Sequence, residues 1–166
     1  MIVFDASTLI LLAKAELLER FLQDFPGQIT IPKEVERECC GATKSLDALL
    51  IRKAINEKRI RVNELKNRKL RDRIEDDFPV GTGEAEAIAL ALSLNADLVA
   101  IDDKHGINAC KLLGISFTTA INILLRMHEK GLIEKEEALF NLEALERHGR
   151  YKAEIVKDAR GKLEVR

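Results

Sequence analysis

The sequence predicts an α/β fold, a three-layer α/β/α sandwich with a central parallel sheet. Short apolar runs alternate with longer helical segments along the chain, a pattern typical of a parallel sheet whose strands are joined by helices. The strand-like runs are continuously apolar, as expected for strands buried on both faces. The chain has 166 residues, of which 46% are hydrophobic, so it can enclose a substantial core.

The first third of the chain contains two strand candidates and two helical patterns. A strand is expected over residues 1–5, where the apolar run is continuous. A helical pattern over residues 7–22 follows, either unbroken or interrupted once. Residues 28–31, "QITI", form the second strand candidate. Pro32 suits the first turn of the next helix, and Gly41 is a suitable residue to end it.

The middle of the chain adds further helices and strands. A helix is expected over residues 45–58 and a minor strand over residues 59–62. Residues 64–77 are highly charged, which is consistent with either an exposed helix or a mobile segment. The stretch 81–95 is a glycine-rich entry into an Ala- and Leu-rich helix, and it lacks the lysine of a phosphate-binding loop. Residues 97–101 form the next buried strand candidate.

The last third of the chain is mostly helical. Residues 114–117 form the final strand candidate, and helices are expected over residues 119–131 and 134–149. The tail over residues 150–166 is polar, and its pattern specifies no structure. Because no segment resembles a linker between domains, we expect all 166 residues to form a single domain, with 134–166 as a helical C-terminal extension.

Composition and charge exclude several classes of protein. The chain has 27 basic and 28 acidic residues, so an anionic ligand would need a local basic patch. Three cysteines without CxxC spacing argue against a disulfide framework or a zinc site. No apolar stretch approaches the roughly 20 residues that span a bilayer, and no basic region precedes the first apolar run. We therefore expect a cytoplasmic protein without membrane association.

Two aspartates are expected at the carboxyl ends of strands. Asp5 follows "IVF" and Asp102 follows "LVAI". In open parallel sheets, ligands bind beyond this edge. The alternative for each position is a helix N-cap. Asp5 would cap a helix that begins near Ser7, and Asp102 or Asp103 would cap one that begins near Lys104.

Two glutamates lie on helix faces that the pattern turns inward. Glu38 comes three residues after Val35 and borders the apolar stripe that Val35 forms with Cys39. Glu84 shares a helix face with Ile88 and later apolar residues. The alternatives are a solvated flank position for Glu38 and simple stabilisation by the helix N-terminus for Glu84.

Convergence of these acids would create a site for a cation. Four clustered carboxylates cannot all stay ionised without a compensating positive charge. A set of oxygen ligands suits Mg²⁺ or Mn²⁺. The corresponding reaction is metal-assisted hydrolysis of a phosphodiester, in which the metal activates water and stabilises the leaving oxygen.

At this point the chain resembles the PIN-domain nucleases, the fold shared by VapC-type toxins. The matching segments are "IVFDASTLI" (2–10), "IPKEVEREC" (31–39), "GTGEAEAIALALSLNADLVAIDD" (81–103), "LLGIS" (112–116) and "LLRMHEKGLI" (124–133). Their order and spacing carry the resemblance over most of residues 1–133. The resemblance implies a PIN-like sandwich and an endoribonuclease that uses Mg²⁺ or Mn²⁺.

The resemblance also implies roles for particular residues. The acids that match the family's catalytic positions are Asp5, Glu38, Glu84 and Asp102. Asp5, Glu84 and Asp102 would hold metal, with Asp103 as a second candidate for the last position, while the remaining acid would hold a second metal or orient water. Ser7 matches the small hydroxyl residue that supports Asp5. The glutamate at position 84 stands where many relatives have aspartate.

Three functions compete on this basis. The leading hypothesis is a metal-dependent endoribonuclease that hydrolyses RNA, acting as the toxin of a toxin–antitoxin pair. The second is a non-catalytic RNA-binding or scaffold PIN domain, which would have no need for four clustered acids. The third is a phosphoacceptor receiver domain, which we disfavour because "GISFTTA" offers no lysine after a late strand.

RNA, an antitoxin and a second copy of the chain are the expected partners. Lys104, beside the acids, is the first candidate for contacting RNA. Weaker candidates are Arg71, Arg73 and Arg126. A homodimer is expected from the resemblance and from the apolar late helices. There, leucines at three-residue spacing can serve both the core and a second face; they are Leu139, Leu142 and Leu145.

Overall fold

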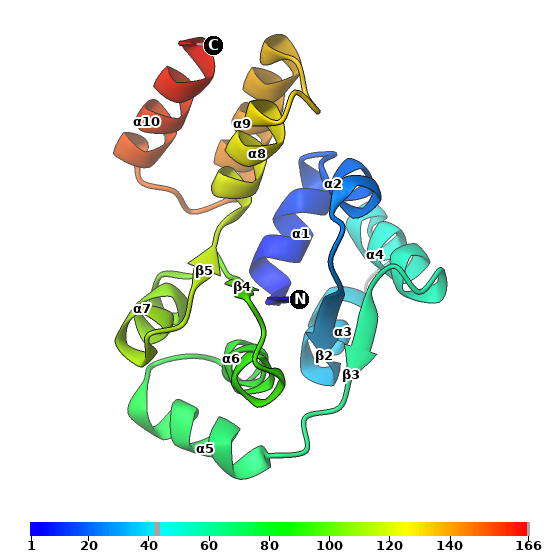
Figure 1. Cartoon of the computed structure of the whole chain (residues 1–166), viewed down its shortest axis with the longest axis vertical. Helices are drawn as coiled ribbons and strands as arrows, with labels where there is room; N and C mark the ends of the chain where they lie inside the picture. Colours follow the sequence, from blue (N-terminus) through cyan, green and yellow to red (C-terminus); the bar gives the residue numbers. More distant parts are fainter. Residues whose placement is uncertain (42–43, 166) are drawn as a thin grey trace.

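The structure, a computed structural model, describes residues 1–41 and 44–165. Its centre is a five-stranded sheet in the order β3-β2-β1-β4-β5, and every pairing is parallel. The strands are β1 (Ile2–Phe4), β2 (Ile29–Pro32), β3 (Arg61–Asn63), β4 (Leu98–Ala100) and β5 (Phe117–Thr118). Helices flank the sheet in three α/β/α layers (Figure 1), which confirms the predicted fold class.

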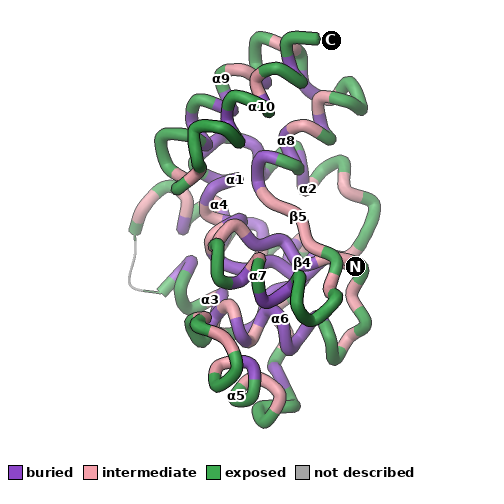
Figure 2. Tube along the Cα trace, turned by 90° about the vertical axis from the view of Figure 1, so that its left-hand side faces the viewer, coloured by how far each residue is buried: buried purple, intermediate pink, exposed green. Residues whose placement is uncertain are grey.

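Ten helices occur within the described residues. They are α1 (Ala6–Lys14), α2 (Leu18–Asp24), α3 (Lys33–Cys40), α4 (Leu46–Asn56), α5 (Arg68–Asp77), α6 (Thr82–Leu94), α7 (Lys104–Leu113), α8 (Ala120–Glu129), α9 (Lys135–His148) and α10 (Ala153–Glu164). Helix α6 packs against β1, β2 and β4, and α1 contacts α3, α4, α8 and α9. The buried residues gather in the strands and on the helix faces turned toward them (Figure 2).

The strand order places a topological switch point beside β1. The chain moves outward from β1 to β2 and β3 on one side, and β4 and β5 lie on the other side. Phe4 pairs with Ala100 in the register of the two central strands, and the Asp5 N–H donates to the Ala100 carbonyl at 2.9 Å. The carboxyl ends of β1 and β4 therefore meet where ligands bind in open parallel sheets.

The helical pattern over residues 7–22 is interrupted, one of the two alternatives that the sequence allowed. Helix α1 ends at Lys14, and Glu16 adopts a left-handed backbone with φ of 60°. An α-helix cannot continue through such a residue, so α2 starts anew at Leu18.

Three predicted boundaries were wrong by a few residues. Pro32 belongs to β2 and is the N-cap of α3, with extended backbone, rather than a residue of the first helical turn. The minor strand begins at Arg61, because the chain before it is still closing α4 through backbone bonds to Ala54. The last strand begins at Phe117, because left-handed Gly114 and the bond from Ile115 N–H to the Cys110 carbonyl complete the end of α7.

Two segments that the pattern left open are helical. Residues 68–77 within the charged stretch form α5, which packs against α6. The tail contains α10, which packs against α8 and α9. None of the helices in the described ranges has the length and apolar character that crossing a membrane requires.

The leucine stripe of α9 belongs to the core. Leu142 and Leu145 are completely buried within the chain, and Leu139 is partly buried against the core. The exposed apolar residue of this helix is Phe140, with 57% of its surface accessible. Leu142 and Leu145 therefore cannot form a dimer surface on α9. The prediction that these leucines also cover a second, exposed face was wrong for these two residues.

Candidate active site

Asp5 lies at the centre of the sheet edge, directly after β1. It is the N-cap of α1, and its Oδ2 accepts hydrogen bonds from the Ser7 hydroxyl at 2.7 Å and from the Ser7 N–H at 3.4 Å. Only 2% of its surface is exposed. Its other oxygen, Oδ1, is buried and has no hydrogen-bond donor. Asp5 is thus both a cap and a buried carboxylate with one unsatisfied oxygen.

Glu38 reaches the same region from α3, which packs against α6. Its carboxylate lies against Gly83, where a Cβ atom would overlap Glu38 Oε1. The absence of a side chain at Gly83 therefore gives the carboxylate its place beside the start of α6. Glu38 remains solvent-exposed, so it lies at the rim of the region.

Glu84 occupies the first turn of α6 and is half-buried. Its Oε2 is a buried oxygen without a hydrogen-bond donor. A Cβ atom at Gly106 would lie 3.4 Å from this oxygen, so the carboxylate sits close to the first turns of α7. Glu84 and Asp5 each contribute one unsatisfied oxygen.

The electrostatic couplings show which carboxylates are neighbours. Burial raises the pKa of Asp5, and the charge of Asp103 raises it further. Burial followed by the charge of Asp5 raises the pKa of Glu38. Burial, together with the charges of Asp5, Asp103 and Glu38, raises the pKa of Glu84 to about 7. These four residues, Asp5, Glu38, Glu84 and Asp103, are hereafter called the acidic cluster.

Asp102 has different surroundings from the acidic cluster. Its Oδ1 accepts hydrogen bonds from the Thr8 hydroxyl at 2.7 Å and the Ala120 N–H at 2.9 Å. Its Oδ2 accepts one from the Tyr151 hydroxyl. Burial raises the pKa of Asp102, and these three hydrogen bonds oppose the rise. Donors from α1, from α8 and from the connection between α9 and α10 thus hold the Asp102 carboxylate.

Asp103 combines two roles that the sequence kept as alternatives. It is the N-cap of α7, and its Oδ1 accepts a hydrogen bond from the His105 N–H at 2.9 Å. Its charge also acts on Asp5 and Glu84. The cap therefore belongs to Asp103 rather than Asp102, and capping does not remove Asp103 from the acidic cluster.

Sequence reasoning missed the donors that hold Asp102. Thr8 is a fully buried polar residue in the first turn of α1, one turn after Asp5, and a buried hydroxyl at that spacing is a weak signal of such a role. Tyr151 lies between α9 and α10, in the tail whose pattern specified nothing. No local feature of the sequence links it to Asp102, since the two are 49 residues apart.

The acidic cluster has the donor chemistry of a site for a hard divalent cation. All of its potential ligands are oxygen atoms, and neighbouring negative charges raise the pKa of Asp5, Glu38 and Glu84, so a cation would relieve the repulsion. Within residues 1–41 and 44–165, no three His, Cys, Asp or Glu side chains are arranged to hold a metal ion by themselves.

Lys104 is the basic residue next to the acidic cluster. It is the first residue of α7, and its side chain is exposed. Of the weaker candidates, Arg73 is exposed on α5, whereas Arg71 and Arg126 form ion pairs with other residues. Arg71 pairs with Asp72 at 2.8 Å and with Glu86 at 3.2 Å. Arg126 pairs with Glu129 at 3.2 Å.

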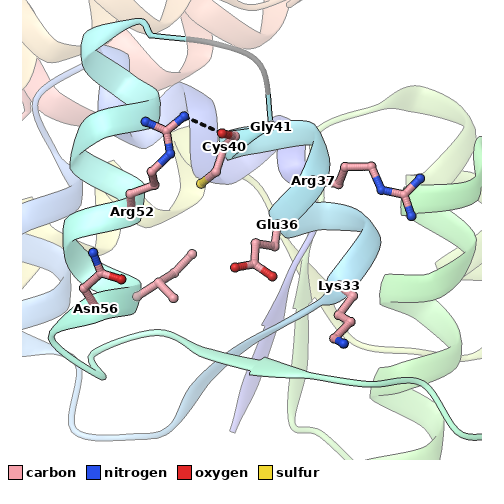
Figure 3. A pocket seen from close by; sticks show the side chains of 8 residues that line it. Lys33, Glu36, Arg37, Cys40, Gly41, Arg52 and Asn56 are labelled. Atoms are coloured by element: carbon pink, nitrogen blue, oxygen red, sulfur yellow. Dashed lines mark hydrogen bonds between the residues drawn. The ribbon is translucent and has the colours of Figure 1, made fainter.

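A cleft of about 540 Å³ lies between α3 and α4 (Figure 3), apart from the acidic cluster. Helix α3 lines it with Glu36 and residues one turn to either side, Lys33 and Cys40. Glu38 follows Glu36 by two residues, about 200° around the helix. The cleft and the acidic cluster therefore use different faces of α3.

The chain matches a protein-family model over nearly its full length. A family model described as a PIN domain matches residues 1–163. No curated protein and no solved structure matches the chain significantly. The family match extends through α9 and into α10, so it includes the helical segment that carries Tyr151.

Proposed function

Because the chain belongs to the PIN-domain family, whose members are generally nucleases, we propose that it is an endoribonuclease that depends on Mg²⁺ or Mn²⁺. The observation that carries the proposal is the acidic cluster at the switch point of the sheet. Neighbouring carboxylates raise the pKa of Asp5, Glu38 and Glu84, and two buried oxygens of the cluster have no hydrogen-bond donor. Clustered carboxylates lower the stability of the folded protein when no cation compensates their charge, so their presence favours a cation-binding role.

The unsatisfied oxygens indicate which residues would hold the ion. Asp5 Oδ1 and Glu84 Oε2 have no competing donors in the described chain. Asp103 is a third carboxylate close enough for its charge to raise the pKa of both residues. Mg²⁺ usually keeps several water ligands and needs only one or two carboxylates. We assign Asp102 a supporting place, because its hydrogen bonds already occupy both carboxylate oxygens.

The remaining groups would act on RNA and water. When bound, the ion supplies an activated water and stabilises the charge of the leaving oxygen. Glu38, exposed at the rim, can orient that water or accept its proton. Lys104 places a positive charge beside Asp103 and can hold a backbone phosphate. Ser7 keeps Asp5 in position through its hydroxyl.

We further propose that the enzyme is the toxin of a toxin–antitoxin pair. The support is the resemblance of its segments to VapC-type toxins. The alternative is a non-catalytic RNA-binding or scaffold domain. Retention of the acidic cluster, with its two buried oxygens that lack donors, favours an enzyme, because a scaffold would be more stable with neutral residues at these positions.

Metal dependence is the direct test of the proposed enzyme. A fluorogenic RNA should be cleaved in Mn²⁺ or Mg²⁺, cleavage should stop with excess EDTA, and it should return when Mn²⁺ is added back. The reason is that clustered carboxylates repel one another, and a bound divalent cation relieves that repulsion. Cleavage that persists in EDTA would contradict the proposal. Metal-independent RNA binding without cleavage in either metal would favour the scaffold function.

We propose that the chain forms a homodimer through its C-terminal helices. Because Leu142 and Leu145 are buried, exposed Phe140 is the residue of α9 that would contact the second copy. Sedimentation at micromolar concentration should give about twice the monomer mass of 18.7 kDa, and Phe140→Glu should reduce it to the monomer mass. Leu112→Glu on α7, where 70% of the leucine is exposed, is the matched control and should leave the dimer intact. A monomeric wild-type protein would rule out this assembly.

A further inference from the structure

Tyr151, near the C-terminal end of the chain, contacts Asp102 at the carboxyl edge of the sheet. It lies in the connection between α9 and α10, and its hydroxyl donates to Asp102 Oδ2. In Figure 1 this connection lies at the end of the α9–α10 pair nearest β5. The chain contains one tyrosine, and this is it. The contact joins the C-terminal helices to the segment that directly precedes Asp103.

The hydrogen bond from Tyr151 continues into the acidic cluster. The Asp102 N–H donates to Ser7 Oγ at 3.2 Å. The Ser7 hydroxyl in turn donates to Asp5 Oδ2 at 2.7 Å. Asp102 accepts through its carboxylate and donates through its backbone N–H, and Ser7 accepts and donates through its hydroxyl. A path of hydrogen bonds therefore runs from Tyr151 through Asp102 and Ser7 to Asp5. Because Asp102 directly precedes Asp103, the hydrogen bonds of Asp102 also restrain the chain next to Asp103.

Local packing holds the tyrosine ring in place. The ring folds back over Gly149, where a Cβ atom would overlap ring carbon Cε2. The ring is half-buried and packs against the hydrophobic core. Among the described residues, the Tyr151 hydroxyl donates to Asp102 Oδ2, whereas Thr8 and Ala120 donate to Oδ1. Without Tyr151, one half of the Asp102 carboxylate would lose its restraint.

We propose that Tyr151 is a positioning residue of the acidic cluster. Through Asp102 it fixes the orientation of Asp103 and, by way of Ser7, that of Asp5. The inference rests on the proposed metal-dependent function, since it concerns the residues that would hold the ion. Residues that orient metal ligands through hydrogen bonds commonly change metal affinity or activity about 10- to 100-fold when replaced.

The test compares Tyr151→Phe with Thr30→Val in the full-length protein. Thr30 is a buried residue of β2, and its hydroxyl donates to the Arg61 carbonyl at 3.0 Å. Both variants therefore lose one hydroxyl hydrogen bond, but only one of them loses a bond on the path to the acidic cluster. Mn²⁺ affinity is measured from the electron paramagnetic resonance signal of free Mn²⁺, and kcat and KM are measured on RNA.

Tyr151→Phe is expected to weaken Mn²⁺ binding about 10-fold and to lower kcat by a similar factor, with KM for RNA unchanged. Thr30→Val should keep wild-type Mn²⁺ affinity. Gly149→Ala retains the hydroxyl, but its Cβ would overlap the Tyr151 ring and crowd the Leu145 carbonyl at the end of α9. By displacing the ring, it should reproduce the loss of Mn²⁺ affinity even if Tyr151→Phe fails to fold. Circular dichroism establishes which variants are folded.

Different outcomes test the positioning role of Tyr151 and the metal-dependent function of the protein. Wild-type Mn²⁺ affinity in folded Tyr151→Phe, or in folded Gly149→Ala, would overturn the positioning role while leaving the metal-dependent enzyme intact. An equal loss of Mn²⁺ affinity in Thr30→Val would also overturn it, because the effect would then be general to the sheet. A wild-type protein that neither binds Mn²⁺ nor cleaves RNA would refute the proposed function and the inference together.

Discussion

Asp5→Asn is expected to reduce RNA cleavage by roughly 10²–10³-fold, the effect of losing several kcal/mol of transition-state stabilisation at a metal site. The fold should survive, because asparagine is as good an N-cap as aspartate and can still accept the bond from the Ser7 hydroxyl. The metal-free variant should even gain roughly 1 kcal/mol, because a buried charge without a full set of donors is removed.

The measurements are single-turnover cleavage of a fluorogenic RNA and urea unfolding without metal. Asp158→Asn is the matched control, since Asp158 is exposed on α10 and pairs with Lys162, and its rate should equal that of the wild type. A wild-type rate for Asp5→Asn would disprove its role in the metal site, and an unfolded variant would show that Asp5 serves mainly the fold. Asp103→Asn should reduce the cleavage rate as Asp5→Asn does. A wild-type rate for Asp103→Asn would instead assign the role of the fourth acid to Asp102.

The free energy of unfolding of the metal-free protein is expected to fall as the pH rises from about 4.5 to about 7. Glutamate has an ordinary pKa of 4.5, which applies to the unfolded chain, while burial and neighbouring charges raise the pKa of Glu84 to about 7 in the folded protein. Between these values the folded state retains a proton that the unfolded state has released, so raising the pH favours unfolding. Partial exposure of Glu84 reduces the loss to roughly 1–3 kcal/mol.

Urea unfolding at pH 5 and pH 8 measures this loss. Glu84→Gln should be less sensitive to pH than the wild type, because glutamine does not titrate. Mg²⁺ should restore stability at pH 8 in the wild type by binding only the folded state, and it should restore little in Glu84→Gln. Stability that falls equally in both proteins would assign the effect to other groups, among them Asp5 and Glu38, whose pKa values are also raised.

Most of the fold was predictable because its signals are local. Continuous apolar runs marked β1, β2 and β4, and helical periodicity marked the long helices. The errors fell where backbone bonds from one element extend into the next, as at Gly114, which prolongs the end of α7. No periodicity records such a bond. The charged stretch and the tail stayed open for a related reason, since α5 and α10 are supported by packing against other helices.

By itself, the sequence predicted that Asp5, Glu38 and Glu84 would gather at the carboxyl edge of a parallel sheet, and it left cap and surface roles open as alternatives. Strand ends and helix faces follow from periodicities of a few residues, and these place carboxylates without knowledge of distant contacts. Only the tertiary structure distinguished Asp102 from Asp103. That distinction depends on donors from Thr8, Ala120 and Tyr151, which reach Asp102 across separations of up to 94 residues, and contacts over such separations leave no trace in the local pattern of a single sequence.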